Sequence, residues 1–181
     1  MPIPERRIRR ATSEDAAAIA SVRIDTWRSA YRGILPDALL DGLDPVDSTA
    51  SWRRGLETVS PDRVAYVTEV SGKVVGFVTA GPERSRNATY PGEVYALYVR
   101  DLYQGRGIGR GLVRVAAAEL VRRGLSPILI WTLRDNPRSR AWYEALGGTV
   151  AGEKRELLEG HELCEVGYGW LDPAPLLRET V

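Results

Sequence analysis

The sequence is poor in the two residues on which metal, thiol and triad chemistry most often depend. It has one cysteine, Cys164, and one histidine, His161, in 181 residues. One thiol cannot form an internal disulfide, and a structural zinc site needs about four ligands, mostly cysteine and histidine. His161 falls in a predicted turn, where we expect a solvated side chain, and Cys164 falls in a predicted strand as a small apolar residue. We therefore expect no metal.

Neither sign of charge dominates, and no apolar run is long. The 25 basic and 24 acidic side chains leave a formal net charge of +1, whereas a dedicated nucleic-acid binder usually carries a clear basic excess. Residues 1–10 contain charges but no apolar h-region, so they lack the pattern of a signal peptide. The apolar run at 127–131 is too short to span a bilayer. We expect a cytoplasmic protein that binds neither nucleic acid nor membrane.

Apolar residues are nevertheless sufficient for one folded domain over 1–181. They make up 44% of the chain. Near the N-terminus, Thr12 and Asp15 fit a capping box at a helix start. Three- and four-residue apolar steps and short helical motifs predict helices at 16–34, 46–58, 107–123 and 138–146. Runs of β-branched and aromatic residues predict strands at 64–70, 74–80, 94–99, 127–133, 149–158 and 162–170.

The order of these elements predicts the fold class. A final hairpin is expected around Glu159 and Gly160, and 171–181 is expected to be a tail. The strand-helix-strand unit in the middle implies neighbouring parallel strands. We predict an α/β fold of the α+β type, with a mixed central sheet of about six to seven strands, parallel central strands and flanking helices.

The most informative stretch is a glycine-rich loop at 104–111, which reads QGRGIGRG. It follows a predicted strand and opens a predicted helix. Spaced glycines let the backbone turn sharply and let a ligand approach closely. The first amides of the helix have no intrahelical partner and, with the helix dipole, favour an anion. The loop therefore predicts a pyrophosphate cradle.

Two common phosphate-binding patterns do not match this loop. G-x-G-x-x-G would place its last glycine at Arg110 or Leu112, and no Gly-Lys-Ser/Thr follows as in a P-loop. The pattern that fits is Q-x-x-G-x-G, at Gln104, Gly107 and Gly109. With this loop and the stretch NPRSRAWYEALG at 136–147, the chain resembles the GNAT superfamily of N-acetyltransferases.

The resemblance implies acetyl-coenzyme A as co-substrate and assigns residues to it. The family's central strand pairs its backbone with the pantetheine arm, and its loop amides hold the pyrophosphate. Its later asparagine contacts the cofactor arm, and its tyrosine lies near the thioester sulfur. Carried over to this sequence, the cofactor-binding residues are Leu97, Tyr98, Val99, Gln104, Gly105, Arg106, Gly107, Ile108, Gly109, Arg110, Asn136 and Tyr143.

The reaction that the resemblance implies is direct attack of an amine on the thioester. Most amines are protonated at neutral pH, so a base must remove a proton, and an acid can protonate the leaving thiolate. We expect Glu93 to act as the base, through an ordered water, and Tyr143 as the acid. Other carboxylates that could serve as the base are Asp25, Asp37 and Glu83.

The acceptor side is less determined. Trp27 and Tyr31 lie one helical turn apart and either belong to the core or line the acceptor site, as this region does in the family. The acceptor is a primary amine of a small molecule, a peptide or a protein, and family analogy suggests a homodimer. A non-catalytic module that binds and senses acyl-coenzyme A is the main alternative, and the failed dinucleotide pattern disfavours a nucleotide-dependent oxidoreductase.

Overall fold

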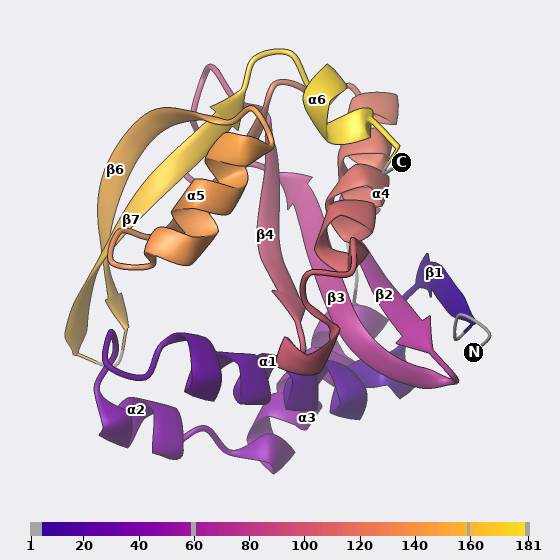
Figure 1. Cartoon of the computed structure of the whole chain (residues 1–181), viewed down its shortest axis with the longest axis vertical. Helices are drawn as coiled ribbons and strands as arrows, with labels where there is room; N and C mark the ends of the chain where they lie inside the picture. The colour runs from indigo at the N-terminus through magenta and orange to yellow at the C-terminus, as the bar shows by residue number, and fades with distance from the viewer. Residues whose placement is uncertain (1–4, 59–60, 159, 180–181) are drawn as a thin grey trace.

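A computed structural model of the chain describes residues 5–58, 61–158 and 160–179 (Figure 1). The strands are β1 (Arg6–Arg10), β2 (Val64–Val70), β3 (Lys73–Pro82), β4 (Gly92–Val99), β5 (Ile128–Leu133), β6 (Thr149–Leu158) and β7 (His161–Trp170). The α-helices are α1 (Ala16–Ala30), α2 (Asp37–Asp41), α3 (Pro45–Glu57), α4 (Ile108–Arg122), α5 (Pro137–Ala145) and α6 (Ala174–Leu177). Two short 3₁₀ turns, η1 (Ser13–Asp15) and η2 (Asp101–Tyr103), precede α1 and the glycine-rich loop.

The strands form one seven-stranded mixed sheet in the order β1-β2-β3-β4-β5-β7-β6. Among the strands of the described residues, β4 and β5 are the one parallel pair, and the other neighbours are antiparallel. This confirms the predicted mixed sheet with parallel strands at its centre. The parallel pair follows from the chain order, because α4 must return the chain to the same end of the sheet before β5 begins.

Helices cover both faces of the sheet (Figure 1). On one face, Ile19 and Val22 of α1 pack with Val67 and Phe77 of the β2–β3 hairpin, and α3 adds Trp52. On the other face, buried side chains of α4, α5 and α6 form the largest core cluster against the sheet. The sheet is therefore a buried layer between two helical layers over most of its N-terminal half.

Several local predictions are confirmed, and their boundaries follow from capping. The capping box of Thr12 and Asp15 is present and leads through η1 into α1. α3 starts at Pro45, because the side chain of Asp44 accepts hydrogen bonds from the amides of Val46 and Asp47. α1 ends at Ala30 rather than continuing to residue 34. Of the expected turn at Glu159 and Gly160, Glu159 lies outside the described residues.

The sequence patterns missed β1, α2 and α6. The segment of β1 reads RRIRR, which has no period-two apolar alternation, and it becomes a strand only because its backbone pairs with β2. Its charges are used in the fold. Arg9 binds Asp15 at 2.7 Å and Glu69 at 2.5 Å. The local composition of this segment indicates no secondary structure. Its contacts with distant residues therefore determine that it forms an edge strand.

The β4–β5 pair separates part-way along its length, and this separation positions the site. The two strands pair only from Gly92 with Ile128 to Val94 with Ile130. Beyond Val94, β4 stays paired with β3, so one backbone edge of residues 95–99 has no neighbouring strand within the described ranges.

Candidate active site

A pocket of about 860 Å³ occupies the space where β4 and β5 separate. β4 contributes Val94–Val99 to its wall, and β5 contributes Ile130–Thr132. The start of α4, the start of α5 and the end of α1 close the remaining sides. Of the cofactor residues expected from the sequence, all except Arg106 and Ile108 line this pocket.

The glycine-rich loop forms one end of the pocket. Gly105 and Gly107 have φ angles of 71° and 75°, in the left-handed region that glycine adopts without strain. Gly107 is the N-cap of α4, and no side chain of the described residues caps this helix. The first hydrogen bond of the helix is that of the Gly111 amide to the Gly107 carbonyl, at 3.0 Å. The preceding amides of the first turn are therefore available to an anion.

Side chains fasten this loop from both of its flanks. Arg6 of β1 donates to the carbonyl oxygens of Arg106 and Gly107, at 3.2 and 3.3 Å. Gln104 Nε2 donates to the carbonyl oxygen of Val99 at 2.8 Å, at the end of β4. Because these contacts occupy carbonyl oxygens, they hold the loop with its amide groups left for a ligand.

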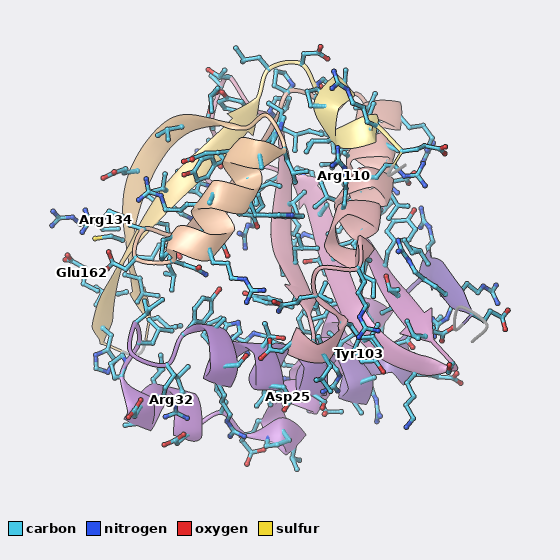
Figure 2. The ribbon with its side chains drawn as sticks, in the orientation of Figure 1. Asp25, Arg32, Tyr103, Arg110, Arg134 and Glu162 are labelled. Atoms are coloured by element: carbon cyan, nitrogen blue, oxygen red, sulfur yellow. The ribbon has the colours of Figure 1, made fainter. Side chains whose placement is uncertain are left out.

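The donors near the loop fit a pyrophosphate. Arg110 Nε is buried and has no hydrogen-bond partner among the described residues, and the residue lines the pocket at the start of α4 (Figure 2). A buried, unpaired donor on a charged side chain is unfavourable unless a ligand satisfies it. Arg138, at the start of α5, lines the same pocket. Arg140 is instead engaged by the Tyr168 hydroxyl at 3.1 Å.

The unpaired edge of β4 and the start of α5 form the middle of the pocket. Leu97, Tyr98 and Val99 line it from β4, and this open edge can accept an extended, amide-bearing arm as an added strand. Asn136 is 7% exposed. Its Oδ1 caps α5 by accepting from the Ser139 amide at 3.1 Å. Asn136 thus has a structural contact and a position in the pocket wall.

Tyr143 is a buried phenol in the pocket wall. It is 7% exposed, and its hydroxyl makes no hydrogen bond within the described part of the chain. Burial, with a smaller contribution from Tyr98, raises the pKa of the Tyr143 hydroxyl. The group therefore keeps its proton over the physiological pH range. Its ring also packs against Tyr168 and Trp170, with centroids 5.7 and 6.2 Å away.

The two expected acceptor residues separate in the structure. Tyr31 lines the pocket, and burial raises its pKa, with the neighbouring Tyr98 hydroxyl adding to the shift. Trp27 does not belong to the described pocket wall. Its ring lies 5.3 Å from that of Tyr31 in an edge-to-face contact, and the Arg23 guanidinium stacks on it at 4.1 Å. Trp27 thus supports Tyr31 from behind.

Glu93 is 2% exposed and ion-paired. Arg84 Nη2 lies 2.5 Å from Glu93 Oε1, and the Arg84 amide donates to Oε2 at 3.1 Å. Glu93 does not line the pocket among the described wall residues, although its neighbours Val94 and Tyr95 do. Glu93 therefore lies beside the pocket wall rather than in it.

The other candidate carboxylates lie outside the described pocket wall. Asp25 lies on α1 (Figure 2) and pairs with Arg100. Asp37 pairs with Arg32 at 3.0 Å. Burial raises the pKa of Glu83, but hydrogen bonds from Ser85 and from the Asn87 amide outweigh it, so the net pKa is lowered.

Several wall residues escaped the sequence analysis. They come from α1 and the turn after it, from β5 and from α5: Thr26, Ser29, Ala30, Ile34, Ile130, Trp131, Thr132, Pro137, Ser139 and Trp142. The apolar run at 127–133 predicts a strand but not which of its side chains turn toward the gap. Within the described ranges, no three His, Cys, Asp or Glu side chains come together as metal ligands, and no helix is long and apolar enough to cross a membrane.

A split parallel strand pair, a glycine-rich loop at a helix start and a buried phenol beside them are together the features of an acyltransferase fold. Comparison with known proteins agrees with this class and identifies the family within it. The model of the acetyltransferase (GNAT) family matches residues 24–148. The chain belongs to this family.

Relatives match over nearly the whole chain. It is 34% identical to the uncharacterized N-acetyltransferase YuaI of Bacillus subtilis, over 93% of this chain and 95% of the relative. It is 27% identical to the probable N-acetyltransferase Rv2775 of Mycobacterium tuberculosis, with the same coverage. The solved structure of YncA, a putative acetyltransferase of Salmonella typhimurium with acetyl-CoA, superposes with a TM-score of 0.66 at 23% identity, covering 98% of this chain and 96% of YncA. The predicted family is therefore confirmed.

Proposed function

We propose that this enzyme transfers the acetyl group of acetyl-coenzyme A to a primary amine by direct attack. The observation that carries the proposal is the pocket between β4 and β5, with the unpaired Nε of Arg110 at one end and the buried phenol of Tyr143 in its wall. A cofactor with a phosphate group at one end and a long amide-bearing arm fits the order of these features along the pocket, from the loop to the open edge of β4. The acetyl-CoA bound to YncA supports the proposal at the level of the fold.

The proposed cofactor site follows the pocket from the loop inward. The amides of Gly109 and Arg110 and the Arg110 guanidinium bind the pyrophosphate. The backbone of Leu97 to Val99 pairs with the arm, and Asn136 contacts it from α5. Acetyl-coenzyme A, when bound, would supply the thioester whose carbonyl the amine attacks, and coenzyme A would leave as the thiol.

Two side chains of this chain move the protons. Glu93 receives the proton of the acceptor ammonium through a water. Tyr143, kept protonated by burial, donates its proton to the departing thiolate. A backbone amide facing the pocket stabilises the carbonyl oxygen as charge develops on it. Tyr31 lines the acceptor end of the pocket, and Trp27 holds Tyr31 in place.

A coupled assay separates this proposal from an acyl-coenzyme A sensor. Thiol release from acetyl-coenzyme A is measured with a panel of amines of small molecules and peptides, and coenzyme A binding is measured by calorimetry. An acetyltransferase releases thiol only when an amine is present. A sensor binds coenzyme A tightly and releases none with any amine, which would overturn the proposal. The cytoplasmic location and the homodimer stay predictions.

A further inference from the structure

Arg84 is an arginine at the edge of the acceptor side that the proposed chemistry does not use. It lies just after β3, in the connection to β4, and its guanidinium faces Glu93 through Nε and Nη2. Arg84 Nη1 makes no hydrogen bond to any described residue. The Arg84 side chain is 52% exposed, whereas that of Glu93 is 2% exposed. One edge of the guanidinium is therefore anchored and the other faces solvent.

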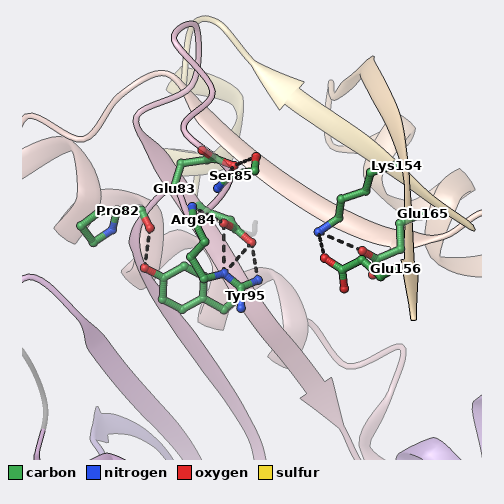
Figure 3. Close-up of polar contacts among 9 residues, drawn as sticks. Pro82, Glu83, Arg84, Ser85, Tyr95, Lys154, Glu156 and Glu165 are labelled. Carbon is green, nitrogen blue, oxygen red and sulfur yellow. Dashed lines mark hydrogen bonds and ion pairs between the residues drawn. The ribbon is translucent and has the colours of Figure 1, made fainter. Parts of the chain in front are cut away.

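A rigid platform holds this orientation. The guanidinium of Arg84 stacks on the ring of Tyr95, 4.4 Å from its centroid. The Tyr95 hydroxyl donates to the carbonyl oxygen of Pro82 at 2.6 Å, which fixes the ring (Figure 3). A planar guanidinium with its anchored edge and its face both occupied has lost its rotamer freedom before any ligand arrives.

The platform also places Arg84 next to the reaction site. Tyr95 is the first β4 residue beyond the paired stretch, and it lines the main pocket. It also lines a second, open depression of about 480 Å³, which includes Arg84. The two hollows thus share one wall residue, at the point where the sheet opens.

Nearby carboxylates are already satisfied. Glu83 accepts from the amides of Ser85 and Asn87, at 2.9 and 2.6 Å. Glu156 and Glu165 both bind Lys154, at 2.7 and 3.1 Å (Figure 3). These carboxylates therefore do not compete for Arg84, and its free N–H donors remain available to a ligand.

We propose that Arg84 binds a carboxylate of the acceptor, so that the acceptor is an amine that carries a carboxylate, as an amino acid does. The Nη1–Nη2 edge of a guanidinium offers two parallel donors to a carboxylate while the Nε–Nη2 edge stays on Glu93. Glu93 is then also the positioning residue of Arg84. The inference rests on the proposed function, since it assigns the substrate class of the same site.

The test compares acceptors that differ only in the carboxylate. For wild type, kcat/KM is measured by thiol release with a series of amino acids, their amides and the matching decarboxylated amines. We expect the acids to exceed both counterparts by at least tenfold. Arg84→Gln should bring the ratio of acid to amide near one. Arg84→Lys, which keeps the charge but loses the two-donor edge, should give an intermediate ratio.

Two further variants control for folding and net charge. Arg84→Gln leaves Glu93 buried without its cation, so Arg84→Gln/Glu93→Gln, which removes both charges, is measured as well and should show the same loss of ratio. Arg54→Gln makes the same charge change on the exposed surface of α3 and should keep the wild-type ratio.

Three results would overturn the inference. They are a wild-type ratio near one, an unchanged ratio in both Arg84 variants that lack the charge, and a preference for polyamines or decarboxylated amines. Each of them leaves the proposed acetyltransferase intact, because thiol is still released. Absence of release with every amine, despite coenzyme A binding, overturns the proposed function and this inference with it.

Discussion

The two ends of the pocket are built in different ways. The proposed cofactor end is made largely of backbone from one continuous stretch, from Leu97 to Arg110, at the end of β4 and the start of α4. The proposed acceptor side is made of side chains from several elements. Tyr31 after α1 and Trp131 on β5 line the pocket, and Arg84 after β3 lines the adjoining depression. A backbone site tolerates many side chains provided that its glycines remain, whereas a side-chain site changes its ligand with single substitutions.

This difference leads to separate expectations for the two regions. Changes on the acceptor side should alter turnover and choice of amine while coenzyme A binding is retained. Changes in the loop should alter coenzyme A affinity first. Changes at the far end of α4 should alter stability alone. The following experiments test this division, from the largest expected effect to the smallest.

The largest effect is expected for Glu93→Gln on the acceptor side. Removing a general base typically lowers the rate by ~10²- to 10⁴-fold. The loss should be greatest near neutral pH and should shrink as pH approaches the pKa of the amine, about 10 for an alkylamine, because the substrate then arrives neutral. The measurement is the pH profile of kcat/KM for both proteins with one amine.

Parallel pH profiles would remove Glu93 as the base and move attention to Asp25, Asp37 and Glu83. A matched thermal stability is the control, because Glu93 also holds Arg84. Converging profiles with lowered stability would leave the base assignment in place and add a structural role.

Tyr143→Phe should lower kcat by roughly 10- to 100-fold, because the ring and its packing stay while the proton donor is lost. Coenzyme A affinity should change little. Single-turnover kinetics and calorimetry on the same preparation measure the two quantities. Wild-type turnover in this variant would exclude Tyr143 as the general acid and leave it only a packing role against Tyr168 and Trp170.

In the loop, Gly107→Val should weaken coenzyme A binding by at least tenfold, about 1.4 kcal/mol. Valine at a φ of 75° is strained and brings a branched side chain to the first turn of α4. Gly124→Val is the matched control. It has a φ of 73°, and a Cβ there meets no atom within 4 Å. The control should lose stability but keep its affinity, and equal affinity losses in both variants would contradict the cradle.

Glu119→Gln should affect stability and leave the site unchanged. Glu119 lies near the end of α4 and binds Arg10, Arg122 and Arg123, each at 2.8 Å. The hydrogen bond from Arg122 leads the contacts that hold the pKa of Glu119 at about 2. A lowered carboxyl pKa adds stability above the unfolded-state value, and this stability is lost as pH falls toward the folded value.

The free energy of unfolding should therefore drop by about 1 to 3 kcal/mol at neutral pH in Glu119→Gln. The difference from wild type should disappear between about pH 4.5 and about pH 2. Urea denaturation over this range measures it. A difference that does not depend on pH would mean that the carboxylate charge is irrelevant, and an altered kcat/KM would break the proposed separation between helix end and site.

Most of the pocket wall at the loop end could be predicted from sequence because its determinants are local. The loop motif consists of residues close together in the chain, Gln104, Gly107 and Gly109. Their spacing predicts both the turn and the start of the helix. The acceptor side could not be predicted in the same way. Nothing near Arg84 in the sequence indicates that Glu93 and Tyr95 hold its guanidinium, and the helical period that links Trp27 with Tyr31 does not say which ring reaches the pocket.

The sequence by itself determined the family, the parallel centre of the sheet and the glycine-rich loop that opens α4. These depend on periodicity, chain order and glycine conformation, which are properties of neighbouring residues. The tertiary structure alone decided where β4 and β5 part, that the RRIRR segment becomes β1, and that Glu93 is buried against Arg84 outside the pocket wall. These depend on pairing and burial between segments far apart in the chain, whose free energies no local pattern contains.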